Sequence, residues 1–172
     1  MRILAFWASN SWAEITPESR RPASFDNSSG ADTDVPVACR PSSDPPAGVD
    51  CVRTQGFWKN HPDDWPVDEL DLGAVGYTQN ELLDILNEPV RGNGLISVAY
   101  QLIAAKLNEA AGAPVPALID QTIADADALI GGLVIPPIGS DSLRTRDTRT
   151  QRELLDDYNN GIADNGPPHC DD

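Results

Sequence analysis

The chain has 172 residues, 40% of them hydrophobic, and it carries 27 acidic against 12 basic side chains, a formal net charge of -15. This length and apolar content are enough for one small domain with its own core. A negative charge of this size repels nucleic acid, which we therefore exclude as a partner. No stretch approaches the roughly 18 consecutive apolar residues of a membrane-spanning helix, so we predict no membrane span.

The first fifty residues have the composition of a disordered tail. Residues 16–50 contain six prolines, many Ser and Asp residues and no apolar periodicity, so they bury too little surface to offset their conformational entropy. The start, "MRILAFWASNSWA", has one arginine and a short apolar run, Ile3 to Ala8. Because this run is shorter than a secretory h-region, two interpretations stay open: the remnant of an export signal, or a mispredicted start followed by a tail.

The folded domain is predicted over 51–172, and helical patterns begin at its start. A short helix is expected over "TQGFWKN". Thr78 with Glu81 forms a capping box that predicts a helix over 79–88, ending before Pro89. The clearest pattern predicts a helix over 96–111, with apolar residues at spacings of three and four and with Ser97, Gln101, Asn108 and Glu109 on the other side.

Two more helices complete the predicted fold. Apolar periodicity predicts one over 115–130, ending at Gly131 and Gly132. The segment "LVIPPIGSDS" is then expected to be an apolar loop, because its adjacent prolines fit neither a helix interior nor a central strand. Thr150 with Glu153 forms a second capping box, for a helix that ends at Gly161. The predicted fold class is therefore all-α, a small bundle of four main helices plus the short first one.

The three cysteines indicate the compartment of the protein. Cys51 and Cys170 lie at the two ends of the predicted domain, and such bracketing is typical of a structural disulfide. Cys39 lies in the tail, and three possibilities stay open for it: a free thiol, a bond to another chain, or competition with Cys51 for Cys170. A structural disulfide predicts an oxidising compartment, and so a secreted or cell-surface protein.

Three segments carry a resemblance to a known type of domain: "CVRTQGFWKNHP", "YTQNELLDILNEPVRGNGLISVAYQLIAAKLN" and "LLDDYNNGIADNGPPHC". Together they resemble an uncharacterised domain that recurs in secreted and surface proteins of bacteria. That domain opens with a C-T-x-T-Q-G-[FY]-W-K-[NT]-H-P pattern and closes with a cysteine after Y-N-N-G. The resemblance covers about 51–170, with Val52 in place of a common Thr and Tyr100 in place of a common His. It implies export and the pairing of the two terminal cysteines, and it implies no reaction.

Candidate functional residues gather in "CVRTQGFWKNHPDDWP", residues 51–66. His61 with Asp64 is the candidate pair for acid–base chemistry, although capping of the short helix is the expected role of the histidine. The carboxylates of Asp63, Asp64 and Asp68 could supply oxygen ligands for calcium. They are only a weak candidate, because their spacing does not fit an EF-hand loop. The possible binding surface comprises Trp58, Lys59, His61 and Trp65, with Trp58 expected in the core.

No catalytic or cofactor fingerprint is present in the sequence, so no cofactor is predicted. The zinc alternative, with His61, His169 and Cys170, lacks the usual ligand spacing. We therefore expect a non-enzymatic extracellular module with a structural or interaction role, whose partner is a protein or another cell-surface component. Two alternatives stay open: a small secreted hydrolase that uses His61 with an acidic partner, and a module that binds calcium or carbohydrate.

Overall fold

A computed structural model describes residues 50–171, all of which belong to the second of two compact units, Pro41–Asp172. The predicted tail, with Cys39, lies outside the described residues except for Asp50. The elements follow in the order α1 (Gln55–Asn60), a 3-10 turn η1 (Pro62–Asp64), β1 (Glu69–Leu72), β2 (Val75–Thr78), α2 (Gln79–Asn87), α3 (Gly94–Ala110), α4 (Ala117–Ile130) and α5 (Arg149–Asn159). In this part of the chain, no helix has the length and apolar character needed to cross a membrane.

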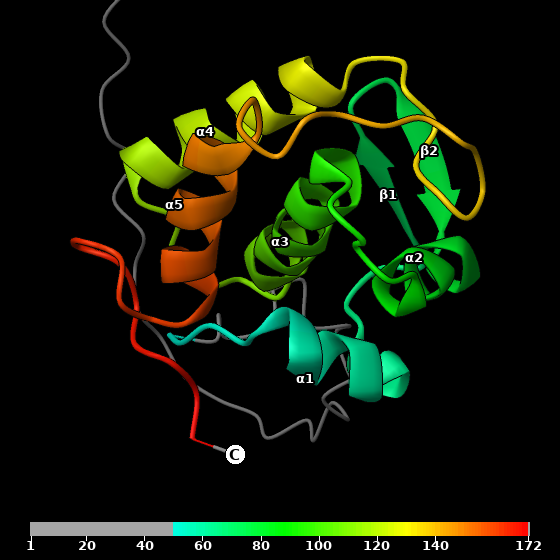
Figure 1. Cartoon of the computed structure of the whole chain (residues 1–172). Helices are drawn as coiled ribbons and strands as arrows, with labels where there is room; N and C mark the ends of the chain where they lie inside the picture. Colours follow the sequence, from blue (N-terminus) through cyan, green and yellow to red (C-terminus); the bar gives the residue numbers. More distant parts are fainter. Residues whose placement is uncertain (1–49, 172) are drawn as a thin grey trace, which may run out of the picture. The chain divides into compact units, whose positions relative to one another are not determined.

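The domain is built around α3. It packs against α4 and α5 on one side and against α2 and β1 on the other, while α1 lies across one end (Figure 1). The predicted polar side of this helix is wrong for Gln101 and Asn108, which are only 7% and 1% exposed, whereas Glu109 is exposed as predicted. Elements surround α3 on nearly all sides, so Gln101 and Asn108 meet other parts of the protein instead of water.

The fold is not all-α, because residues 69–78 form an antiparallel hairpin. Leu72 pairs with Val75 next to the turn, and Leu72 and Tyr77 point into the core. Gly73, in the turn, has a φ of 67°, and a Cβ built on it would lie 2.3 Å from the carbonyl oxygen of Gly131. The turn therefore needs glycine in order to approach the end of α4.

A lysine ties the hairpin to α3 and α4. The Nζ of Lys106 on α3 lies 2.6 Å from the carboxylate of Asp127 on α4 and donates a hydrogen bond to the carbonyl oxygen of Asp71, also at 2.6 Å. The second carboxylate oxygen of Asp127 accepts a hydrogen bond from the backbone N–H of Gly73 at 2.8 Å. The side chains of Lys106 and Asp127 are only 15% and 26% exposed, so each charge depends on the other for stabilisation.

We expect Asp127→Asn to lower the free energy of unfolding by about 1 to 2 kcal/mol, because Lys106 then keeps its charge beside a neutral partner. Urea unfolding followed by circular dichroism measures the change. Asp125→Asn is the matched control, because Asp125 is exposed on the same helix and, within residues 50–171, its side chain bonds only Gln121. A loss with Asp127→Asn no larger than with the control would contradict the structural role of this contact.

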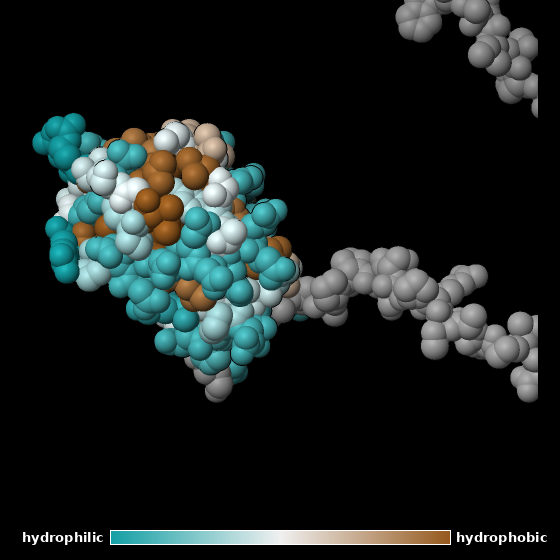
Figure 2. Space-filling view, turned by 90° about the vertical axis from the view of Figure 1, so that its right-hand side faces the viewer, coloured by the Kyte–Doolittle hydropathy of each residue, from teal (hydrophilic) through white to brown (hydrophobic). Residues whose placement is uncertain are grey.

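The segment between α4 and α5 is the predicted apolar loop, and it packs onto the hairpin. Ile135 is fully buried, and its backbone N–H donates a hydrogen bond to the hydroxyl of Tyr77 on β2 at 3.0 Å. Figure 2, which faces the hairpin and α2 side, shows hydrophobic residues grouped on part of this face and hydrophilic residues over most of the rest. The apolar character of the loop is thus largely explained by its packing on the hairpin.

The start of α5 differs from the predicted capping box. The helix begins at Arg149 after Thr148, and Thr150 lies within its first turn. The carboxylate of Glu153 pairs with Arg149 at 2.9 Å instead of capping the backbone.

Tyr158, further along α5, is buried. Burial, and to a smaller extent the charge of Glu109, raises the pKa of its hydroxyl to about 12, so the hydroxyl stays protonated and donates a hydrogen bond to the carbonyl of Pro114.

Candidate functional site

The two ends of the described domain are joined covalently and by backbone pairing. Cys51 and Cys170 form the predicted disulfide, with their Cα atoms 5.0 Å apart. The two segments that carry these cysteines also pair through their backbones. The N–H of Val52 donates to the carbonyl of Pro168, and the N–H of Cys170 donates to the carbonyl of Val52, both at 2.9 Å. The first and last segments therefore form one fixed wall of the domain.

Helix α1 follows directly from this wall and places the aromatic residues. Thr54 begins the helix, because its hydroxyl accepts a hydrogen bond from the N–H of Phe57 at 3.2 Å. Trp58 is 3% and Trp65 is 9% exposed, and the indole N–H of Trp65 donates to the carbonyl of Trp58 at 2.7 Å. Trp58 is in the core as expected, and Trp65 is nearly buried as well, so these two members of the possible binding surface present little of their rings to solvent.

Asn108 on α3 holds the opening segment in place. Its side-chain oxygen accepts hydrogen bonds from the backbone N–H of Arg53 at 2.9 Å and from the indole N–H of Trp58 at 3.2 Å. Its amide group donates to the carbonyl of Arg53 and to the side-chain oxygen of Asn159 on α5. Asn159 in turn donates to Gln101. One buried polar network thus links the opening segment, α3 and α5.

Arg53, Phe57 and His61 form a column on the outer side of α1. The guanidinium carbon of Arg53 lies 3.9 Å from the centre of the Phe57 ring, and the His61 ring is stacked 4.2 Å from it at an interplanar angle of 15°. Two groups this close to one ring must occupy its opposite faces. The Phe57 ring is therefore covered on one face by a cation, which suits its negative π-surface, and on the other by the imidazole.

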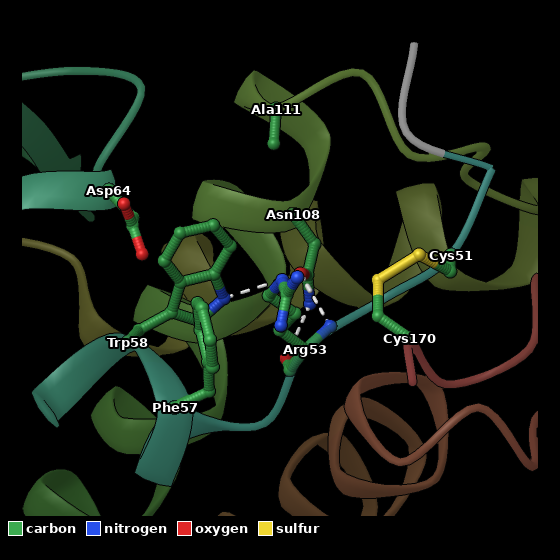
Figure 3. A pocket seen from close by; sticks show the side chains of 8 residues that line it. All are labelled: Cys51, Arg53, Phe57, Trp58, Asp64, Asn108, Ala111 and Cys170. Atoms are coloured by element: carbon green, nitrogen blue, oxygen red, sulfur yellow. Dashed lines mark hydrogen bonds between the residues drawn. A yellow bond between two sulfur atoms is a disulfide. The ribbon is translucent and has the colours of Figure 1, made fainter. Parts of the chain in front are cut away.

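A pocket of about 280 Å³ opens between this column and the disulfide (Figure 3). Its apolar walls are Phe57, Trp58, Ala111 and the disulfide, and its polar groups come from Arg53, Asp64 and Asn108. A shallower depression of about 390 Å³ adjoins it, sharing Arg53, Phe57 and Asp64 and adding His61 and Asp171. Both hollows rest on elements that the disulfide and Asn108 keep in place.

The predicted catalytic pair lies at the shallower depression. His61 is exposed and ends α1, as expected, and its Nδ1 lies 2.9 Å from the carbonyl oxygen of Phe57. Because a carbonyl oxygen can only accept a hydrogen bond, Nδ1 carries the hydrogen in this contact. Asp64 lines the same depression, but among the described residues the imidazole forms its polar contact with the backbone and not with this carboxylate.

Apart from Asp64, the remaining candidates line neither hollow. Lys59 points to neither hollow, since it lines neither of them. Within residues 50–171, no three His, Cys, Asp or Glu side chains gather as a metal site requires, so Asp63, Asp64 and Asp68 do not converge on a calcium ion. The carbonyl of Asp68 instead accepts a hydrogen bond from the N–H of Gln79, at the start of α2.

Four residues of the pocket were not foreseen from the sequence: Arg53, Phe57, Asn108 and Ala111. A usable signal existed for Phe57, because it lies four residues before His61, which places both on one side of the short helix. Arg53 precedes that helix, so no helical spacing indicates its position. Asn108 and Ala111 belong to the pocket only because α3 ends beneath α1, and nothing local in the sequence encodes that contact.

Comparison with known proteins does not assign this chain to a family: no protein-family model, curated protein or solved structure matches it.

Proposed function

We propose that the domain is a non-catalytic, extracellular interaction module that binds a protein or another cell-surface component through the pocket beside the disulfide. The observation that carries the proposal is the construction of this pocket. Its walls come from both ends of the domain and from α3, and they are joined by the Cys51–Cys170 bond and by Asn108. Because the walls of the pocket are already ordered, binding does not cost the conformational entropy of ordering them.

The lining favours a ligand group with an apolar body and polar edges. Phe57, Trp58, Ala111 and the disulfide supply apolar contact, whereas Asp64 offers a carboxylate and Arg53 a guanidinium. An aromatic or aliphatic side chain of a partner protein, flanked by hydrogen-bonding backbone, matches this chemistry. Sugar stacking is less well supported, because both faces of Phe57 are covered and Trp58 is buried.

Two observations favour binding over hydrolysis. Among the residues that line the two hollows, none is a serine, a threonine or a free thiol, so the hollows lack the nucleophile of hydrolases that form an acyl-enzyme. The imidazole of His61 is stacked on Phe57 and bonded to a backbone carbonyl, which explains the residue as the end of α1. A disulfide that closes the domain supports the extracellular compartment.

The proposal is tested by selecting binders from a random peptide display library on the oxidised, full-length chain. Ala111→Phe places a bulky ring in the pocket, and we expect it to weaken the selected peptides by about tenfold or more. Ala128→Phe is the matched control, because Ala128 is exposed on α4 and lines neither hollow. Peptide affinities measured by isothermal titration calorimetry compare the two variants.

Equal affinities for the two variants would overturn the proposed binding site. A separate measurement addresses the alternative function: the wild-type chain and His61→Gln are assayed on a panel of ester, peptide and glycoside substrates. Turnover that His61→Gln abolishes would establish the hydrolase in place of the binding module.

A further inference from the structure

The end of α5 breaks a local packing rule. The N–H of Gly161, with a φ of 69°, donates to the carbonyl of Tyr158, and the N–H of Ile162 donates to the carbonyl of Asp157, both at 2.9 Å. These two bonds define a Schellman motif, in which the residue after the glycine usually packs on an apolar side chain one turn back. Here that position holds Asp157, and Ile162 is left 70% exposed.

A second exposed aliphatic side chain lies across from it. Leu118, near the start of α4, is 59% exposed, and it lines the same pocket as Ile162. The pocket has a volume of about 160 Å³, and its other apolar residues are Ile119, Leu154 and Ala163. An apolar cavity of about 150 Å³ holds a molecule as large as benzene, so this one accepts a single large side chain.

These two side chains are not exposed because of a flexible backbone around them. Helices α4 and α5 pack against each other (Figure 1), and the hydroxyl of Tyr158 bonds the carbonyl of Pro114 just before α4. The two bonds of the Schellman motif fix the backbone of Ile162. The apolar patch is therefore presented on a rigid support.

The charges around the pocket select its occupant. Its remaining lining residues are Asp157 and Asp164, both exposed, and no basic residue of the described chain lines it. A second copy of this chain would bring a net charge of the same sign, formally -15, against these carboxylates. A segment that combines an apolar side chain with Lys or Arg residues is complementary in both respects.

We propose that the pocket between α4 and α5 docks a basic, amphipathic segment of a partner protein. One aliphatic or aromatic side chain of that segment enters between Leu118 and Ile162, and its flanking cations pair with Asp157 and Asp164. This surface is distinct from the pocket beside the disulfide, because the two share no lining residue.

The test uses the oxidised full-length chain and a fluorescein-labelled peptide, Gly-Lys-Leu-Lys-Leu-Lys-Gly, followed by fluorescence polarisation. We expect saturable binding that falls about tenfold with Leu118→Ser/Ile162→Ser and about tenfold with Asp157→Asn/Asp164→Asn. Ile138→Ser and Asp63→Asn/Asp84→Asn are the matched controls: Ile138 is 41% exposed, the two carboxylates are exposed, and all three lie outside this pocket. We expect both controls to keep the wild-type affinity.

Three results would overturn the proposal. Binding that falls equally with Asp63→Asn/Asp84→Asn would show general charge attraction instead of docking. Undiminished binding of a peptide with serine in place of leucine would show that the apolar pocket is unused. Absence of peptide binding, together with a dimer in sedimentation velocity that Ile162→Ser dissociates, would assign the patch to a second copy of the chain.

Discussion

Replacing Asn108 with alanine is expected to lower the free energy of unfolding by about 3 to 5 kcal/mol. The substitution removes the partner of two buried groups, the indole N–H of Trp58 and the side-chain oxygen of Asn159, and of two partly buried ones, the N–H and carbonyl of Arg53. Each buried polar group left without a hydrogen bond costs about 1 to 3 kcal/mol, although water entering through the adjoining pocket recovers part of this. Urea unfolding, followed by circular dichroism and by tryptophan fluorescence, measures the loss.

Asn87→Ala is the matched control for this prediction. Asn87 is also a helical asparagine, but it is exposed on α2, and among the described residues its amide bonds only the carbonyl of Leu83. Its replacement should change the free energy of unfolding by less than about 0.5 kcal/mol. If Asn108→Ala were as mild as this control, the network would not hold the opening segment, and the pocket would lose its rigid wall.

Removal of the disulfide with Cys51→Ala/Cys170→Ala is the second large effect. The bond closes a loop with a sequence separation of 119, and chain entropy alone gives a stabilisation of about 4 to 5 kcal/mol. For a domain of this size, that corresponds to a fall in Tm on the order of 15 °C or more. Differential scanning calorimetry of the variant, and of the wild-type chain with and without a reductant, measures the fall.

Cys39→Ser separates the effect of the bridge from a general effect of cysteine loss. Cys39 is not part of the bridge that the structure contains, so this variant should keep the wild-type Tm. A reduction that lowers the Tm by only a degree or two would contradict the disulfide's role in stability. A large fall with Cys39→Ser would instead mean that this cysteine takes part in the pairing.

The helices and the disulfide follow from local signals in the sequence. Apolar periodicity, the capping box of Thr78 and Glu81, and the position of Gly131 define α2, α3 and α4 to within about two residues. The cysteines at the two ends of the domain indicate the bridge without any knowledge of the fold. The helix signals act over a few residues, and the disulfide signal depends only on where the cysteines stand along the chain.

The hairpin and the pocket depend on tertiary contacts and were missed for that reason. The hairpin strands have four residues each and include one glycine and two acidic residues, a composition that seldom favours strands. They are stabilised by the packing of Leu72 and Tyr77 and by the approach of Gly73 to α4. Likewise, Asn108 is polar in a helical pattern, and only the surrounding helices bury it.

The most direct test of the proposed function is a nitrogen-15 NMR titration of the oxidised chain with a selected peptide. Trp58 lines the pocket and its indole N–H bonds Asn108, whereas the Trp65 indole lies beneath α1 and outside the pocket. We predict that the indole signal of Trp58 and the backbone signals of Arg53, Phe57 and Asp64 shift together, with little change at Trp65. Shifts confined to other surfaces, with Trp58 unmoved, would contradict binding at the pocket beside the disulfide.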